Sequence, residues 1–195
     1  MSRRPILASI LVIIAGRWVV GCASHGGSGP YAPQAEAARD GIRAQKLTQD
    51  AAAILDKDPV KGERLLREAL TADLYNGPAH IDLGVLFLEQ GKLYEAAGEF
   101  EWARRLLPGH PDPRMNLAVV LERAGRVDEA LTNYRSALEV YPEYLPAVQG
   151  LARLQVKSGK TDAHTRTLLQ DVALRGETDR WKEWARTALT RLPRE

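Results

Sequence analysis

Cysteine is nearly absent from this sequence, because Cys22 is the single one among 195 residues. An intramolecular disulfide framework is therefore excluded. Aromatic residues make up only 6% of the chain, and the net charge is only +2. Three arginines account for that excess, since they lie within residues 1–22, which contain no acidic side chain. The remainder is nearly neutral, so its charge gives no general reason to expect nucleic-acid binding.

The apolar segment near the start of the chain is too short to span a bilayer, which takes about 20 residues. Residues 6–15 are almost entirely apolar and follow two arginines, an order typical of an export signal peptide. The segment ends in the letters VVGC, which resemble the lipobox of bacterial lipoproteins. The resemblance implies a signal peptide over residues 1–21 and lipidation of Cys22, palmitate included. An uncleaved amphipathic anchor or a buried free thiol is the alternative interpretation.

Glycine, serine and proline dominate residues 23–33 and predict a flexible tether over residues 22–35. Two or more acyl chains on Cys22 would attach the protein stably to a membrane. Ala23 stands where aspartate commonly signals inner-membrane retention in such lipoproteins. The resemblance therefore favours a lipid-anchored protein of the cell envelope, at the outer membrane and facing the periplasm.

A spacing of 34 residues organises the rest of the chain. Gly91, Gly125 and Gly159 follow it. The same interval separates several apolar or small residues: Leu83, Leu117 and Leu151; Gly84, Ala118 and Ala152; Leu66, Phe100, Tyr134 and Leu168; and Ala69, Ala103 and Ala137. Repetition on one period indicates stacked copies of one structural unit, each of which buries its apolar face against its neighbours.

Residues of these types at these places resemble the tetratricopeptide repeat (TPR), a unit of two helices. The resemblance is good for residues 77–110 and 111–144 and weaker for the degenerate units 36–76 and 145–178. It implies an all-α fold, a right-handed TPR superhelix of about four helix pairs. Residues 179–195 would add a C-terminal capping helix.

The residue types also predict how these helices end and pack. The three repeated glycines would each follow a helix with positive φ. Asp58 and Pro59 predict an N-cap and a first helical residue, and Gly84 would let the two helices of its unit approach closely. We expect Trp181 and Trp184 to pack on the preceding helices, with a tryptophan-led binding patch as the alternative.

No set of residues predicts catalysis, a metal site or a cofactor. His25, His80, His110 and His164 each lack a second ligand at a metal-binding spacing. The letters GKT at 159–161 imitate the end of a phosphate-binding loop, but a leucine stands where its first glycine belongs. We therefore expect a protein that is not an enzyme.

In TPR proteins the first helix of each pair lines a groove for a partner. Carried over to this sequence, the groove positions grade from apolar to basic along the chain. They are Leu47, Ala51, Ile54, Ile81, Val85, Leu88, Met115, Val119, Glu122, Arg123, Gln149, Arg153 and Lys157. We expect a peptide or amphipathic helix of another envelope protein there, with acidic residues toward one end. Alternatively, the superhelix or residues 31–45 cover these side chains.

Together these expectations describe a non-catalytic scaffold or adaptor of the bacterial cell envelope. Such a protein would support a pilus, a secretion machine or a cell-wall complex. Two alternatives remain open: a cell-wall-active hydrolytic enzyme with an unrecognised site, and a structural lipoprotein that forms a homo-oligomer.

Overall fold

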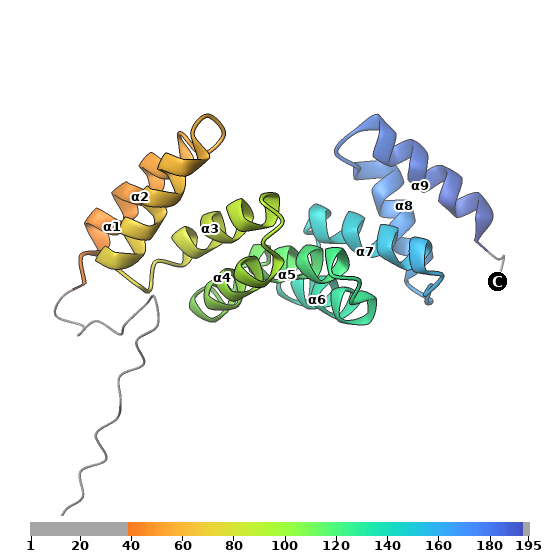
Figure 1. Ribbon diagram of the computed structural model, residues 1–195. Helices are drawn as coiled ribbons and strands as arrows, with labels where there is room; N and C mark the ends of the chain where they lie inside the picture. Colours follow the sequence, from red (N-terminus) through yellow and green to blue (C-terminus); the bar gives the residue numbers. More distant parts are fainter. Residues whose placement is uncertain (1–38, 193–195) are drawn as a thin grey trace, which may run out of the picture. The chain divides into compact units, whose positions relative to one another are not determined.

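The computed structural model describes residues 39–192, and all regular secondary structure in that range is α-helical (Figure 1). The all-α class expected from the repeats is therefore confirmed. The helices are α1 (Gly41–Ala52), α2 (Pro59–Ala72), α3 (Gly77–Glu89), α4 (Leu93–Leu106), α5 (Asp112–Arg123), α6 (Val127–Val140), α7 (Leu145–Ser158), α8 (Thr165–Arg175) and α9 (Asp179–Arg191). No helix in this range is long and apolar enough to cross a membrane. Cys22, the predicted signal peptide and the predicted tether lie outside the described residues.

The helices follow one another as antiparallel pairs, and each packs against the next along the chain (Figure 1). The first helices of successive pairs, α1, α3, α5 and α7, also contact one another. No comparable contact joins the second helices within the described residues. The first helices therefore share one side of the row, named the inner face below.

Acidic side chains start the helices of the first pair. Asp40 accepts a hydrogen bond from the backbone N–H of Arg43 at 2.9 Å, and Asp58 accepts one from Lys61 at 3.0 Å. These bonds satisfy N–H groups that have no partner within the helix. Pro59 is the first residue of α2, as its place after Asp58 predicts.

Glycine turns end the first helix of each of the next three pairs. Gly91, Gly125 and Gly159 have φ values of +74°, +75° and +68°, which residues other than glycine rarely adopt. The positive φ predicted from the 34-residue interval is confirmed. The two central pairs need only residues 90–92 and 124–126 between their helices, whereas α7 and α8 are joined by the longer segment 159–164.

The repeated apolar series forms the core between helices until the fourth pair. Leu66, Phe100 and Tyr134 are at most 1% exposed. Leu168, the expected fourth member, is only half-buried, and Leu169 is fully buried instead. Leu168 nevertheless packs against two groups of buried side chains, one from α5, α6 and α7 and one from α7, α8 and α9, so it contributes to the core as the 34-residue interval predicts.

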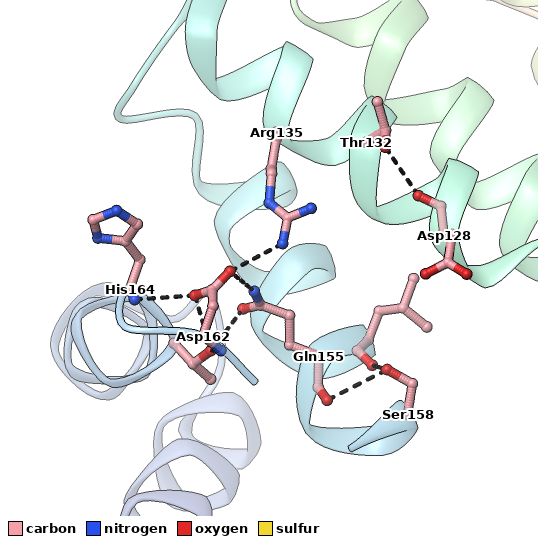
Figure 2. A network of polar contacts seen from close by, with 9 residues as sticks. Asp128, Thr132, Arg135, Gln155, Ser158, Asp162 and His164 are labelled. Carbon is pink, nitrogen blue, oxygen red and sulfur yellow. Dashed lines mark hydrogen bonds and ion pairs between the residues drawn. The ribbon is translucent and has the colours of Figure 1, made fainter. Parts of the chain in front are cut away.

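Asp162 holds the start of α8 from the connection that precedes it (Figure 2). Its carboxylate accepts hydrogen bonds from Arg135 Nη2 at 2.9 Å and from Gln155 Nε2 at 2.7 Å. It also accepts the backbone N–H of His164 at 3.0 Å, and the Thr165 hydroxyl lies 3.2 Å away. One carboxylate thus joins α6, α7 and α8 where the repeat pattern of the sequence weakens.

Candidate functional site

Ten of the thirteen residues predicted to line the groove are half-buried or exposed. All of them lie on first helices except Ile54, which lies in the turn after α1. The ten are Leu47, Ile54, Ile81, Val85, Met115, Val119, Glu122, Arg123, Arg153 and Lys157. These side chains therefore lie on, or next to, the helices that form the inner face.

Three predicted groove residues are instead buried between helices. Ala51, Leu88 and Gln149 are 0%, 7% and 4% exposed. Their placement in an open groove is corrected accordingly. The Gln149 amide nitrogen is also buried without a hydrogen-bond partner in the described residues.

The apolar part of the inner face is shallow. Ile81, Val85, Met115 and Val119 are half-buried, and the last two pack against the buried core. The large apolar side chains that are strongly exposed in residues 39–192 lie at other positions: Ile42, Val60, Tyr75, Tyr94, Tyr141 and Leu174. The exposed patch expected from the sequence is therefore a band of partly covered side chains.

The charged end of the inner face is organised around Glu122. Arg153 donates from both terminal nitrogens to the two carboxylate oxygens of Glu122, each at 2.7 Å, and Lys157 Nζ lies 3.8 Å away. Burial raises the pKa of the Glu122 carboxyl, but the Arg153 hydrogen bonds and charge outweigh burial and hold this pKa below its usual value. Two cations against one carboxylate leave this end positively charged.

Arg123 has a different role from its neighbours at this end. Its Nη1 donates a hydrogen bond of 2.8 Å to the backbone carbonyl of Leu88, near the end of α3. Carbonyl groups in the last turn of a helix lack partners within the helix. Arg123 therefore ties α5 to α3 and has less freedom to meet a partner than the sequence suggests.

A cleft of about 480 Å³, named the α7–α9 cleft, lies between α7 and the start of α9. Its walls are formed by Arg153, Thr178, Arg180, Trp181 and Trp184. The two indole rings meet edge to face, with centroids 5.4 Å apart. Arg180 has no hydrogen-bond or ion-pair partner among residues 39–192. The cleft therefore offers a free cation beside aromatic surface.

Both tryptophans also pack against the buried side chains of α7, α8 and α9, so their predicted packing role is confirmed. Neither the role of Arg180 nor the cleft itself was predicted from the sequence. A signal was present, because an arginine and two tryptophans stand within the first two turns of the last helix. Their approach to Arg153, however, depends on how α9 packs.

Two Tetratricopeptide repeat profiles match the sequence, over residues 81–144 and 121–182, which together cover just over half of the chain. The protein belongs to the TPR family. TPR domains generally mediate protein–protein interaction, and the fold is typically a non-catalytic scaffold. No curated protein sequence matches this chain.

Several solved structures resemble the described helices. The first TPR of Spaghetti (RPAP3), bound to an HSP90 peptide, is 15% identical, with a TM-score of 0.59 over 64% of this chain and 98% of that one. MamA is 16% identical, with a TM-score of 0.56 over 75% of this chain and 74% of that one. Both likenesses show the TPR fold alone.

A mutant of the Thermobaculum terrenum O-GlcNAc transferase is 30% identical, with a TM-score of 0.62 over 68% of this chain. The match covers only 26% of the transferase chain. Most of that enzyme therefore has no counterpart in this match, and its activity does not transfer to this TPR protein.

His80 has a structural role in this TPR protein. His80 is fully buried, with Nδ1 2.6 Å from a carboxylate oxygen of Glu99 and Nε2 2.9 Å from the carbonyl of Leu74. Its ring also stacks on Trp102. His80 therefore ties α3 to α4 and to the end of α2. Within residues 39–192, no group of three or more His, Cys, Asp or Glu side chains is placed to hold a metal ion.

Proposed function

We propose that this TPR protein is a non-catalytic adaptor of the bacterial cell envelope, held at the outer membrane by lipid on Cys22. Its inner face would bind a segment of another envelope protein and bring that protein into a pilus, secretion or cell-wall complex. The general role of TPR domains supports the binding part of the proposal. The solved structure of the RPAP3 domain, which contains a bound HSP90 peptide, supports it as well. The lipobox letters around Cys22 support the location.

The α7–α9 cleft is the observation that supports partner binding most directly. Tryptophan and arginine are over-represented among the residues that dominate the energy of protein interfaces. A carboxylate of the partner would meet Arg180, which has no partner in the part of the chain that the structure describes, and Arg153, which Glu122 holds in one orientation. Because that orientation is set in advance, less conformational entropy is lost on binding. The expected partner segment is therefore amphipathic, with acidic residues toward α9.

Crosslinking in cells, followed by affinity purification of the full-length protein, tests this proposal. Arg180→Glu reverses the charge of the cleft without removing any contact that the structure records, so we expect the partner to be lost. Lys57→Glu is the matched control, because Lys57 is exposed in the turn after α1 and undergoes the same change of charge. Equal recovery of every crosslinked protein by Arg180→Glu and by the wild type would refute the proposal.

A second variant tests whether the apolar band of the inner face contributes to partner binding. Val85→Glu combined with Val119→Glu places two carboxylates among its half-buried side chains, and both side chains are accessible, unlike the buried Leu88. Val60→Glu is the control, since Val60 is 80% exposed on α2. Circular dichroism would show that each variant is folded. A folded double variant that retains the partner would exclude the band from the interface.

The membrane location is tested separately at Cys22. Cys22→Ser removes the thiol that would carry the diacylglyceryl group, so incorporation of labelled palmitate should cease and the protein should leave the membrane fraction. Separation of the inner and outer membranes then tests the proposed address. Palmitate labelling that persists in Cys22→Ser would exclude Cys22 as the lipid site.

Self-association is distinguished by light scattering on the purified protein. An adaptor would be monomeric or would keep its oligomeric state in Arg180→Glu. If wild-type crosslinks join only copies of this chain, and Arg180→Glu is monomeric, then the α7–α9 cleft is a homo-oligomer contact and the adaptor proposal is wrong.

A further inference from the structure

A second hollow, of about 500 Å³, lies on the inner face at the opposite end of the row. It is named the α1–α3 hollow. Its walls come from α1, from the chain between α2 and α3, and from α3, and most of its lining side chains are polar. Asp73 and Asp82 are the ionisable side chains among its lining residues.

Two of these polar groups are already occupied by other parts of the chain. The Asp73 carboxylate accepts Arg39 Nε at 2.9 Å and the backbone N–H of Tyr75 at 3.0 Å. Asn76 donates to the Thr48 hydroxyl at 3.2 Å and caps α3 through its side-chain oxygen. Neither group therefore needs a ligand from outside.

Asp82 differs from Asp73 because no cation pairs with it among the described residues 39–192. It is half-buried on α3, and no hydrogen bond or ion pair to its carboxylate exists among residues 39–192. Burial raises the pKa of Asp82 to about 6, with no compensating cation. A partly buried carboxylate without a partner destabilises the folded protein. Such a group is also well placed to bind an incoming cation.

Two neighbouring side chains of α1 offer further hydrogen-bond acceptors to a cation in the hollow. Gln45 and Gln49 line the hollow, and both are exposed without a recorded side-chain hydrogen bond. Their amide oxygens are acceptors for an N–H donor. A cation in the hollow would therefore meet one carboxylate and two amide groups. A single free carboxylate suits an ammonium or guanidinium group, whereas metal ions take several oxygen ligands.

We propose that the α1–α3 hollow receives a lysine or arginine side chain of the protein segment bound on the inner face, with Asp82 as its counter-ion. This inference rests on the proposed adaptor function, and it also predicts the direction in which the partner segment lies along the inner face. The partner segment would place its basic residue against α1 and α3 and its acidic residues toward α7 and α9. Reversal of the segment would set like charges against each other at both ends.

Nuclear magnetic resonance titration of the full-length protein tests the hollow without knowledge of the partner. The probes are Nα-acetyl-lysine amide and its uncharged analogue Nα-acetyl-norleucine amide. The lysine probe should give saturable shifts at the side-chain amides of Gln45 and Gln49, and the norleucine probe should not. Asp82→Asn should weaken lysine-probe binding about tenfold or more.

Asp56→Asn is the matched control, because it removes the same charge from an exposed residue outside the hollow. It should leave lysine-probe binding unchanged. Equal shifts with both probes, no saturable shift in the wild type, or equal binding by Asp82→Asn would each overturn the inference.

The crosslinking experiment then separates this inference from the proposed function. If the wild type and Asp56→Asn capture an envelope protein but Asp82→Asn does not, both stand. If all three capture it equally, the adaptor function stands and the assignment of Asp82 fails. If the wild type captures nothing, the adaptor function fails, whereas the probe titration still decides whether the hollow binds a cation.

Discussion

Glu122 on α5 and Arg153 on α7 join two successive first helices through paired hydrogen bonds of 2.7 Å. Glu122 is 12% exposed at its side chain and Arg153 36%, so the pair lies partly inside the row. The Tyr134 hydroxyl also lies 3.4 Å from Glu122. One ion pair therefore links neighbouring TPR units and orients an arginine that lines the α7–α9 cleft.

Glu122→Gln should lower the free energy of unfolding by about 1 kcal/mol, because it removes the charge but keeps an acceptor for Arg153. The pKa of Glu122 in the folded protein is below its usual value of 4.5. Stabilisation by the carboxylate is therefore fully present above that value and is lost as the pH falls below it. Thermal unfolding at several pH values checks this, and a difference between wild type and variant that stays constant down to acid pH would contradict it.

Substitution of glycine by alanine should have opposite effects on stability at two positions of the second helix pair. A Cβ on Gly84 would lie 2.6 Å from the ring of Phe100, which is fully buried and has no room to move. Gly84→Ala should therefore destabilise the protein by about 1–3 kcal/mol. Gly98 lies within α4 with open space around it, so Gly98→Ala should stabilise it by about 0.5–1 kcal/mol. Denaturant unfolding measures both changes, and equal effects would refute this account of the packing.

The 34-residue interval was sufficient to predict the helix pairs and the three glycine turns, because both depend on local residue types. The full burial of Leu169 was not predictable in the same way. The residues that correspond to it at the 34-residue interval are charged: Arg67, Glu101 and Arg135. The interval therefore gave no reason to expect a buried side chain at position 169.

The candidate site was less predictable than the fold, for a related reason. Family positions indicate which helix face a side chain occupies, but not how closely the next helix covers that face. Leu88 and Gln149 are buried for this reason. Asp82 and Arg180 are ordinary charged residues in the sequence, and only the structure shows that neither has a partner within residues 39–192.

Asp162→Ala should destabilise the packing of α8, although Asp162 itself is exposed. The substitution removes the acceptor for Arg135 and for the Gln155 amide, and Gln155 is fully buried (Figure 2). A buried donor left without a partner costs about 1–3 kcal/mol. Amide hydrogen exchange in α8 should accelerate while exchange in α3 stays unchanged. Asp56→Ala is the control because Asp56 is exposed in the turn after α1, far along the chain from α8. Equal acceleration in both variants would show that the carboxylate of Asp162 is not what holds α8.

Asp82→Asn should make the protein more stable at neutral pH, although it removes the proposed ligand of a cation. Burial raises the pKa of Asp82 from 3.8 to about 6, so its ionised form is disfavoured by folding. The resulting destabilisation is absent below pH 3.8, where the carboxyl is protonated in both states, and fully present above about 6. After allowance for its partial exposure, we expect a gain of about 1–2 kcal/mol at neutral pH.

Melting temperatures of the wild type, Asp82→Asn and Asp56→Asn across this pH range measure the effect. Asp82→Asn should exceed the wild type at neutral pH and converge with it in acid, whereas Asp56→Asn should follow the wild type throughout. If Asp82→Asn is more stable than the wild type but no longer binds the lysine probe, then the Asp82 carboxylate binds the cation and also lowers the stability of the folded protein. If Asp82→Asn is less stable than the wild type at neutral pH, then the carboxylate has a stabilising contact within the protein, and the hollow is not a vacant cation site.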